Sequence, residues 1–315
     1  MFGKNRMFSI IPAMFLLCSL SSWADLSEIV DGKIEQVATG FQFTEGPVWH
    51  PDGYLLFSDI PANQIIKWTA VNTFEVFREP SDNSNGLALD MKGRLIACET
   101  SKRRVSRTRK DGTIVTLAEK FEEKRLNSPN DLAIRSDGTI YFSDPDFGTP
   151  KGEKDLAWQG VYRISPDRKL FLEAKEGFEK PNGLALSPDE KTLYVDDSHT
   201  GFIQAFDVQP DGSLKNGRRF GEIPAKGLDG AKVDVKGNLY VTASDGISVF
   251  DPSGKRIGLI EVPEGPANLA FGDADFKTLY ITAKKSLYRM RMKNEGFRPV
   301  SPTFKEAGSG GGKKN

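Results

Sequence analysis

Histidine and cysteine are nearly absent from this chain of 315 residues, which contains two of each. The histidines, His50 and His199, are too few for a histidine-rich metal site, and they argue against a Ser-His-Asp triad. Cys18 lies in an N-terminal apolar stretch, which leaves Cys98 in the segment RLIACE. We expect Cys98 to be a buried strand residue and the mature chain to contain no internal disulfide.

Neither charge is in excess, because 43 Lys and Arg balance 43 Asp and Glu. This balance argues against nucleic acid or an anionic membrane surface as a partner. The basic run KRRVSRTRK at 102–110 alternates with apolar residues. We therefore expect it to form the solvent-facing side of a strand, with an anion site as the alternative.

A hydrophobic run long enough to span a membrane is also missing. The mostly apolar stretch at 7–20 is too short for a span and contains a proline. Basic residues precede it, and the small residues Ser22 and Ala24 occupy positions −3 and −1 of a cleavage site, as in a secretory signal. We expect residues 1–24 to be a signal peptide, and the mature protein to be periplasmic or secreted and free of the membrane.

What the chain does contain is a sixfold repeat. Each segment has a polar first residue, an alternating apolar run, a turn and a second apolar run. The first residues are Glu45, Asn85, Asn130, Asn182, Asp229 and Asn268. Two alternating runs joined by a Gly- or Asp-containing turn predict a β-hairpin, and further strand-like segments follow in each unit.

Four short strands in each unit of about 40–50 residues are typical of a β-propeller blade. We therefore predict an all-β fold: a six-bladed β-propeller of four-stranded antiparallel blades around a central tunnel, occupying residues 25–300 as a single domain. Residues 32–41 should supply the outer strand of the last blade, beside 286–292, which would remove an exposed edge. The glycine-rich tail at 301–315 is expected to be flexible.

The innermost strand of each blade lines the tunnel, so the first residues of the repeats should form a ring at one mouth. Two carboxylates facing several amides would repel each other without a cation. Oxygen ligands, with no thiolate or imidazole, favour one hard divalent ion such as Ca²⁺, whose charge Glu45 and Asp229 would neutralise. The alternative for each residue is an ordinary turn cap.

The long loop at 144–159 should open at the same end of the tunnel. It is predicted to cover the metal and shape a substrate pocket, a plain surface insertion being the alternative. Asp131, beside Asn130, is expected to orient its neighbours or to serve as an auxiliary acid–base group. The residues expected to contact the substrate or to surround the metal ligands are Asp131, Asn85, Asp144 and Phe147.

The motifs TEGPVW, SPND, KPNGLALSPDEKTLYVDDS and GLDGAKVDVKGNLYV occur in this order between about Glu45 and Met292. Together they resemble the regucalcin and gluconolactonase family of six-bladed propellers, whose relatives include diisopropyl fluorophosphatase and the paraoxonases. The resemblance implies a catalytic divalent metal bound by Glu45, Asn182 and Asp229. It also implies that Asn130 completes the site, as ligand or substrate contact, and that Asp229 acts as general base or nucleophile.

We accordingly predict a metal-dependent hydrolase that opens a small lactone or similar ester. The metal would act as a Lewis acid, and Asp229 would take a proton from the attacking water. Calcium is the favoured ion, with zinc, magnesium and manganese as alternatives. An arginine that contacts sugar in regucalcin is replaced here by Ser128, which argues against gluconate-type specificity.

Two other functions remain open at this point. The first is a non-catalytic propeller that binds a ligand or a protein on its top face, since propellers serve both purposes. The second is an organophosphate or aryl ester hydrolase that uses the same residues. The oligomeric state is also left open.

Overall fold

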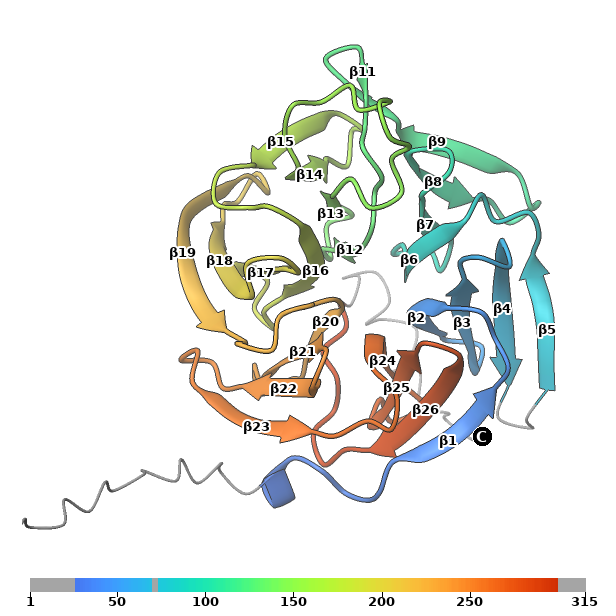
Figure 1. The fold of residues 1–315 in the computed structure, drawn as a ribbon, viewed down its shortest axis with the longest axis vertical. Coiled ribbons are helices and arrows are strands. Elements are labelled where there is room, and N and C mark those ends of the chain that lie inside the picture. The colour runs from blue at the N-terminus through green and yellow to red at the C-terminus, as the bar shows by residue number, and fades with distance from the viewer. Residues whose placement is uncertain (1–25, 70–72, 300–315) are drawn as a thin grey trace, which may run out of the picture.

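The structure is a computed structural model that describes residues 26–69 and 73–299 (Figure 1). The predicted signal peptide at 1–24 and the predicted tail at 301–315 lie outside the described residues. A short 3-10 helix, η1 (Leu26–Glu28), precedes the first strand, and strands form nearly all the remaining regular structure. No helix in the described part of the chain has the length and hydrophobicity needed to cross a membrane.

Six four-stranded antiparallel sheets are arranged around a central axis, which confirms the predicted six-bladed propeller (Figure 1). Blade 1 contains β2 (Thr44–His50), β3 (Tyr54–Asp59), β4 (Gln64–Thr69) and β5 (Thr73–Arg78). Blade 2 contains β6 (Ser84–Leu89), β7 (Leu95–Glu99), β8 (Arg104–Thr108) and β9 (Ile114–Ala118). A small hairpin of β10 (Lys120–Phe121) and β11 (Lys124–Arg125) follows.

The second half repeats the same order, with the innermost strand first in each blade. Blade 3 contains β12 (Leu132–Ile134), β13 (Ile140–Asp144), β14 (Gly160–Ile164) and β15 (Leu170–Ala174). Blade 4 contains β16 (Pro181–Leu186), β17 (Thr192–Asp197), β18 (Phe202–Val208) and β19 (Leu214–Glu222). Blade 5 contains β20 (Ala231–Val233), β21 (Leu239–Ala243), β22 (Gly246–Phe250) and β23 (Arg256–Ile260).

Blade 6 closes the ring by combining both ends of the described chain. Its strands β24 (Pro266–Gly272), β25 (Thr278–Ala283) and β26 (Ser286–Arg291) are joined by β1 (Glu35–Thr39). β1 pairs antiparallel with β26, from Glu35 opposite Arg289 to Thr39 opposite Ser286. The predicted outer strand is therefore confirmed, and the pairing removes an edge that β26 would otherwise expose.

The hairpins that begin each blade follow from their turn residues. In blade 3 the Asp-Gly turn places Gly138 at φ 91°, a conformation that favours glycine. The Asp137 carboxylate accepts a hydrogen bond from the Thr139 amide at 2.9 Å, which fixes the turn between β12 and β13. The short turn keeps each innermost strand in register with its neighbour.

Apolar side chains pack between neighbouring blades. Trp49 of blade 1 stacks on Tyr280 of blade 6 with ring centroids 5.5 Å apart, and Trp68 belongs to the same buried cluster. Cys98 on β7 is fully buried in another cluster, as predicted. Because the apolar faces of the blades are covered by neighbouring blades, the polar residues at the start of the innermost strands line the axis.

The expectation that 102–110 forms the solvent-facing side of a strand was wrong for Arg103. Lys102, Arg109 and Lys110 are exposed, but Arg103 is only 2% exposed. Its guanidinium donates hydrogen bonds to the carbonyl oxygens of Leu126, at 2.6 Å, and of Glu153, at 2.8 Å. The sequence pattern is alternating, yet this arginine turns inward because three carbonyl groups, including that of Asn127, need a donor there.

Candidate functional site

The innermost strands of neighbouring blades contact one another around the axis (Figure 1), and the residues that begin the repeats lie at or near the start of these strands. Hydrogen bonds from Asn130 N to Ser143 O (2.9 Å) and from Asp229 N to Thr242 O (3.1 Å) extend the ladders of blades 3 and 5 to these residues. Five of the residues are buried, namely Glu45, Asn85, Asn130, Asn182 and Asn268. We call Glu45, Asn85, Asn130, Asn182 and Asp229 the inner ring.

Glu45 and Asp229 come from blades 1 and 5, and their carboxyl groups lie close enough for each to shift the pKa of the other. Burial raises the pKa of Glu45, and the negative charge of Asp131 raises it further, against opposing bonds from Gly46 N (2.6 Å) and Asn268. Burial and the charge of Glu45 raise the pKa of Asp229 well above its usual range. A cation between the two groups would relieve this repulsion.

Asp229 differs from the rest of the inner ring in its exposure. It is half-buried, while the other four residues are buried. Asp229 is therefore the least buried residue of the inner ring.

Asn268 does not belong to the inner ring, contrary to the prediction. The amide of Gly86, which follows a ring residue, donates to Asn130 O at 2.8 Å, and the amide of Gly230 donates in the same way to Ala267 O at 2.8 Å. Ala267 therefore occupies the sixth ring position, which has no side-chain oxygen. Asn268 lies one residue further along its strand, at the level of Asp131.

Asp131 and Asn268 instead form a second layer beneath the ring. They come from opposite blades, 3 and 6, and Asn268 Nδ2 donates to Asp131 Oδ2 at 3.2 Å across the axis. Glycines make room for them, since a Cβ on Gly86 would lie 2.6 Å from Asp131 Oδ1, and one on Gly230 would overlap the Asn268 amide. The hydrogen bond from Asn268 holds the Asp131 carboxylate near Glu45, where its negative charge acts on the Glu45 carboxyl group.

Asp196 is a buried site residue that sequence reasoning missed. It is 1% exposed; its Oδ1 accepts a hydrogen bond from Gly183 N at 3.1 Å, and its Oδ2 has no partner in the described structure. Burial raises its pKa, and its charge contributes to the raised pKa of Asp229. The signal was available: LYVDD places an aspartate where LLFSD and IYFSD place Ser58 and Ser143.

The free oxygen atoms of the site fit a hard divalent cation. Asn85 Oδ1 and Asn182 Oδ1 are buried and have no hydrogen-bond partner among the described residues. Asn182 Nδ2 donates to Ser198 Oγ at 2.9 Å, which commits the nitrogen and leaves the oxygen free. Because no three described His, Cys, Asp or Glu side chains form a metal cluster, a cation here would need these amide oxygens as ligands.

Asp144 acts on the backbone next to the ring. It is fully buried and accepts hydrogen bonds from the amides of Asn127 and Ser128, both at 2.8 Å. Burial raises the pKa of Asp144 to about 7, against the effect of these two bonds. These two bonds hold the backbone segment that leads into Asn130. Asp144 therefore supports the inner ring through the backbone.

The loop at 144–159, which we call the lid, lies over this segment. The amide of Gly148 donates to Ser128 Oγ at 3.1 Å, and Arg103 holds the Glu153 carbonyl oxygen. Phe147 is 52% exposed, and Lys180 Nζ lies 5.1 Å from the centre of its ring. The lid is thus attached to Ser128 and to Arg103, and Phe147 is exposed beside Lys180.

Comparison with known proteins places the chain in a family. The family described as SMP-30/Gluconolactonase/LRE-like region matches residues 43–285. The gluconolactonase of Zymomonas mobilis is 35% identical over 303 residues, covering 85% of this chain and 83% of that protein. Regucalcin of Bos taurus is 28% identical over 253 residues, covering 76% and 83%.

A solved structure agrees with the sequence relatives. The gluconolactonase of Xanthomonas campestris superposes with a TM-score of 0.80 at 34% identity, covering 86% of this chain and 93% of that chain. The match therefore includes the blades that provide the inner ring. The chain belongs to the SMP-30/gluconolactonase/LRE-like family.

Proposed function

We propose that this protein hydrolyses a lactone with a divalent cation held by Glu45, Asn130, Asn182 and Asp229. The names of its relatives, gluconolactonase among them, support the reaction class. The observation that carries the proposal is that the buried Glu45 and Asp229 carboxyl groups, from separate blades, shift each other's pKa, while Asn182 Oδ1 has no hydrogen-bond partner among the described residues. Two acids forced together at the mouth of a tunnel suit a cation site better than a purely structural role.

A bound cation would supply Lewis-acid stabilisation for the negative charge that develops on the lactone carbonyl oxygen. Asp229 takes a proton from the water that attacks the carbonyl carbon. The ring C–O bond then breaks, and the proton passes from Asp229 to the departing ring oxygen. The product is a hydroxy acid, and the carboxylate of Asp229 is restored.

The remaining residues hold this arrangement in place. Asn130 supplies either an amide ligand or a contact to the substrate. Asp131 is fixed by Asn268 at 3.2 Å and orients the polar groups around Glu45. Oxygen ligands of this kind favour Ca²⁺, although Zn²⁺, Mg²⁺ and Mn²⁺ also bind carboxylates.

The test is lactone opening, followed with a pH indicator, in protein treated with a chelator and then resupplied with single divalent ions. The panel includes sugar lactones, acyl lactones and aryl esters, so that it separates lactonase from aryl esterase activity. Asp229→Asn should lower kcat by about 10²–10⁴-fold, the usual contribution of an acid–base group. The matched control is Asp59→Asn, since Asp59 is a buried carboxylate that bonds only to backbone amides in the described structure.

Two outcomes would contradict the proposal. One is full activity in metal-free protein, and the other is unchanged activity in both Glu45→Gln and Asp229→Asn. A protein that binds lactones without opening them would favour the non-catalytic alternative.

We also propose that the protein is exported. The proposal is supported by the basic, apolar and small-residue order of residues 1–24. N-terminal sequencing of the protein recovered from its native compartment should begin at Asp25. Recovery of uncleaved protein from the cytoplasm would contradict it.

A further inference from the structure

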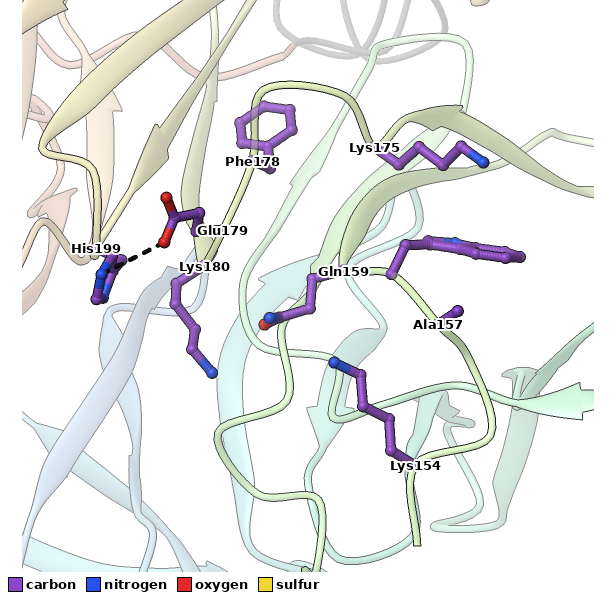
Figure 2. A pocket seen from close by; sticks show the side chains of 9 residues that line it. Lys154, Ala157, Gln159, Lys175, Phe178, Glu179, Lys180 and His199 are labelled. Carbon is purple, nitrogen blue, oxygen red and sulfur yellow. Dashed lines mark ion pairs between the residues drawn. The ribbon is translucent and has the colours of Figure 1, made fainter. Parts of the chain in front are cut away.

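A pocket of about 410 Å³ lies between the lid and blade 4, next to the inner ring but lined by none of its residues (Figure 2). The lid contributes Lys154, Trp158 and Gln159, and the connection into blade 4 contributes Lys175, Glu179 and Lys180. Figure 2 shows the side-chain ends of Lys154, Gln159 and Lys180 directed toward the same part of the pocket. Lys175 is directed away from that part of the pocket and lies along the ring of Trp158 (Figure 2).

These lysines are not matched by an equal number of carboxylates. Lys154 Nζ lies 3.0 Å from Asp146 Oδ2, and Lys180 pairs with the other oxygen of the same carboxylate. Two ammonium groups therefore share one negative charge. Lys175 has no carboxylate partner among the described residues, and its Nζ lies 4.6 Å from the ring centre of Trp158.

The other charges near the pocket do not cancel this excess. Glu179 also lines the pocket, 3.3 Å from His199, and its carboxylate offsets one lysine charge, so three lysines face two carboxylates, those of Asp146 and Glu179. In the neighbouring pocket on blade 4 each arginine has its own partner, Arg218 with Asp207 at 2.6 Å and Arg219 with Glu222 at 3.6 Å. Excess positive charge is therefore a property of the pocket beside the lid.

This pocket is within reach of the inner ring. Lys180 precedes Asn182 by two residues, so their Cα atoms are at most about 7 Å apart. Asn182 also contacts Ser198, the residue before His199, through the hydrogen bond of 2.9 Å. The pocket and the inner ring are therefore formed by neighbouring residues of the same two segments.

We infer that the pocket is a subsite for an anionic group on the substrate, so the preferred substrates are lactones that carry a carboxylate or phosphate substituent. This inference rests on the proposed lactone hydrolysis and adds the substrate class. Lysine ammonium groups bind carboxylate and phosphate oxygens through charge-assisted hydrogen bonds. Lys175 is the ammonium best placed to bind a ligand, because no protein carboxylate competes for it.

The experiment compares lactone pairs that differ in one anionic group. Glucaro-1,4-lactone is paired with glucono-1,4-lactone for a carboxylate, and 6-phosphoglucono-1,5-lactone with glucono-1,5-lactone for a phosphate. Wild-type protein should show a higher kcat/KM for the anionic member of at least one pair, and the preference should shrink as salt is added. Lys175→Met should lower kcat/KM for that member by about tenfold, mainly through KM, while the neutral member changes less than about twofold.

Two further variants separate a subsite from a general charge effect. Lys175→Arg keeps the positive charge and should restore most of the preference. Lys151→Met removes an exposed lysine of the same lid that does not line the pocket, and it should leave the preference unchanged.

Each remaining result overturns the inference. The subsite is refuted if the neutral member of each pair is opened as well as the anionic one, or if Lys175→Met slows both members equally. If wild-type protein opens some lactones without preferring anionic ones, only this inference fails. If it opens no lactone at all, the proposed function fails and the substrate class falls with it.

Discussion

Replacing Glu45 with glutamine should stabilise the metal-free protein and abolish its stabilisation by a divalent cation. Glu45 is 2% exposed and its carboxyl group lies beside that of Asp229. In the absence of a cation, ionisation of both acids is opposed by burial and by their mutual repulsion. Glutamine is nearly isosteric, keeps an oxygen for the Gly46 amide and carries no charge.

The size of the effect follows from the pKa of Glu45, which is raised from 4.5 to about 7. A shift of this size corresponds to about 3 kcal/mol, at 1.36 kcal/mol for each pKa unit. The folded protein binds this proton more tightly than the unfolded chain does, so the free energy of unfolding falls as the pH rises from about 4.5 to about 7. Glu45→Gln should therefore gain up to about 3 kcal/mol above pH 7 and almost nothing near pH 4.5.

A divalent cation should reverse the order of the two proteins. Wild-type protein at a hundred times the dissociation constant gains about 2.7 kcal/mol, because the ligand binds only the folded state. The glutamine variant has lost half of the ring's carboxylate charge and should gain little. Glu45 therefore lowers the stability of the metal-free protein, although the cation needs it for binding.

The measurement is thermal or urea unfolding at pH 5 and pH 8, in chelator and in saturating Ca²⁺. Asp59→Asn is the control, because Asp59 is buried in the same blade and accepts hydrogen bonds from Gln42 N and Phe43 N. That variant should be less stable in every buffer and should keep the full cation-induced shift. The reasoning is refuted if Glu45→Gln is less stable than wild type in chelator at pH 8, or if Ca²⁺ shifts both proteins equally.

Three other variants test the surroundings of the ring. Asp144→Asn should cost about 1–3 kcal/mol in urea unfolding, because an amide cannot accept both backbone hydrogen bonds as the carboxylate does; an unchanged midpoint would contradict this. Gly183→Ala should cost about 3 kcal/mol or more, since its Cβ would lie 2.5 Å from Asp196 Oδ2 and overlap the Asp229 carbonyl oxygen, whereas Gly93→Ala, with open space, should cost only about 1 kcal/mol. Asn268→Asp should lower the melting temperature more at pH 8 than at pH 5, because a third buried carboxylate would then face Glu45 and Asp131; equal losses would refute the contact.

The repeat made the propeller and most of the inner ring predictable. Six hairpins at blade spacing require a closed ring, and a closed ring brings the first residues of all innermost strands to one mouth. This reasoning needs no side-chain detail, which is why Glu45 and Asp229 could be brought together from the sequence. The order of the blades along the chain also determines which of them lie opposite each other, as blades 3 and 6 do.

The error at Asn268 has a local cause. The turn at 272–277 in blade 6 is one residue longer than the corresponding turn in blade 4, where KTLY also begins the next strand. Aligning the two repeats without a gap matches Asn268 with Asn182. The structure instead matches Ala267 with Asn182. A shift of one residue changes the layer of a side chain in the tunnel, and only the hydrogen bonds between neighbouring strands reveal it.

The environment of Arg103 and the pocket beside the lid could not be predicted for a different reason. Both depend on loops that meet in space, the lid with the connections before Asn130 and Asn182. Loop conformation is set by contacts such as the hydrogen bond from Gly148 N to Ser128 Oγ. Contacts of this kind produce no periodic pattern of residues in the sequence. The side chains that shape substrate access are therefore those that sequence patterns describe least.

The second layer also determines from which side a ligand can arrive. Asp131 and Asn268 hydrogen-bond across the axis directly beneath the ring, and the buried Asp196 carboxylate lies beside them. Under the proposed function a lactone would approach from the opposite side, where the lid and its pocket lie. Because catalysis and selection then share one entrance, changes in the lid can alter which lactones are opened without moving Glu45 or Asp229.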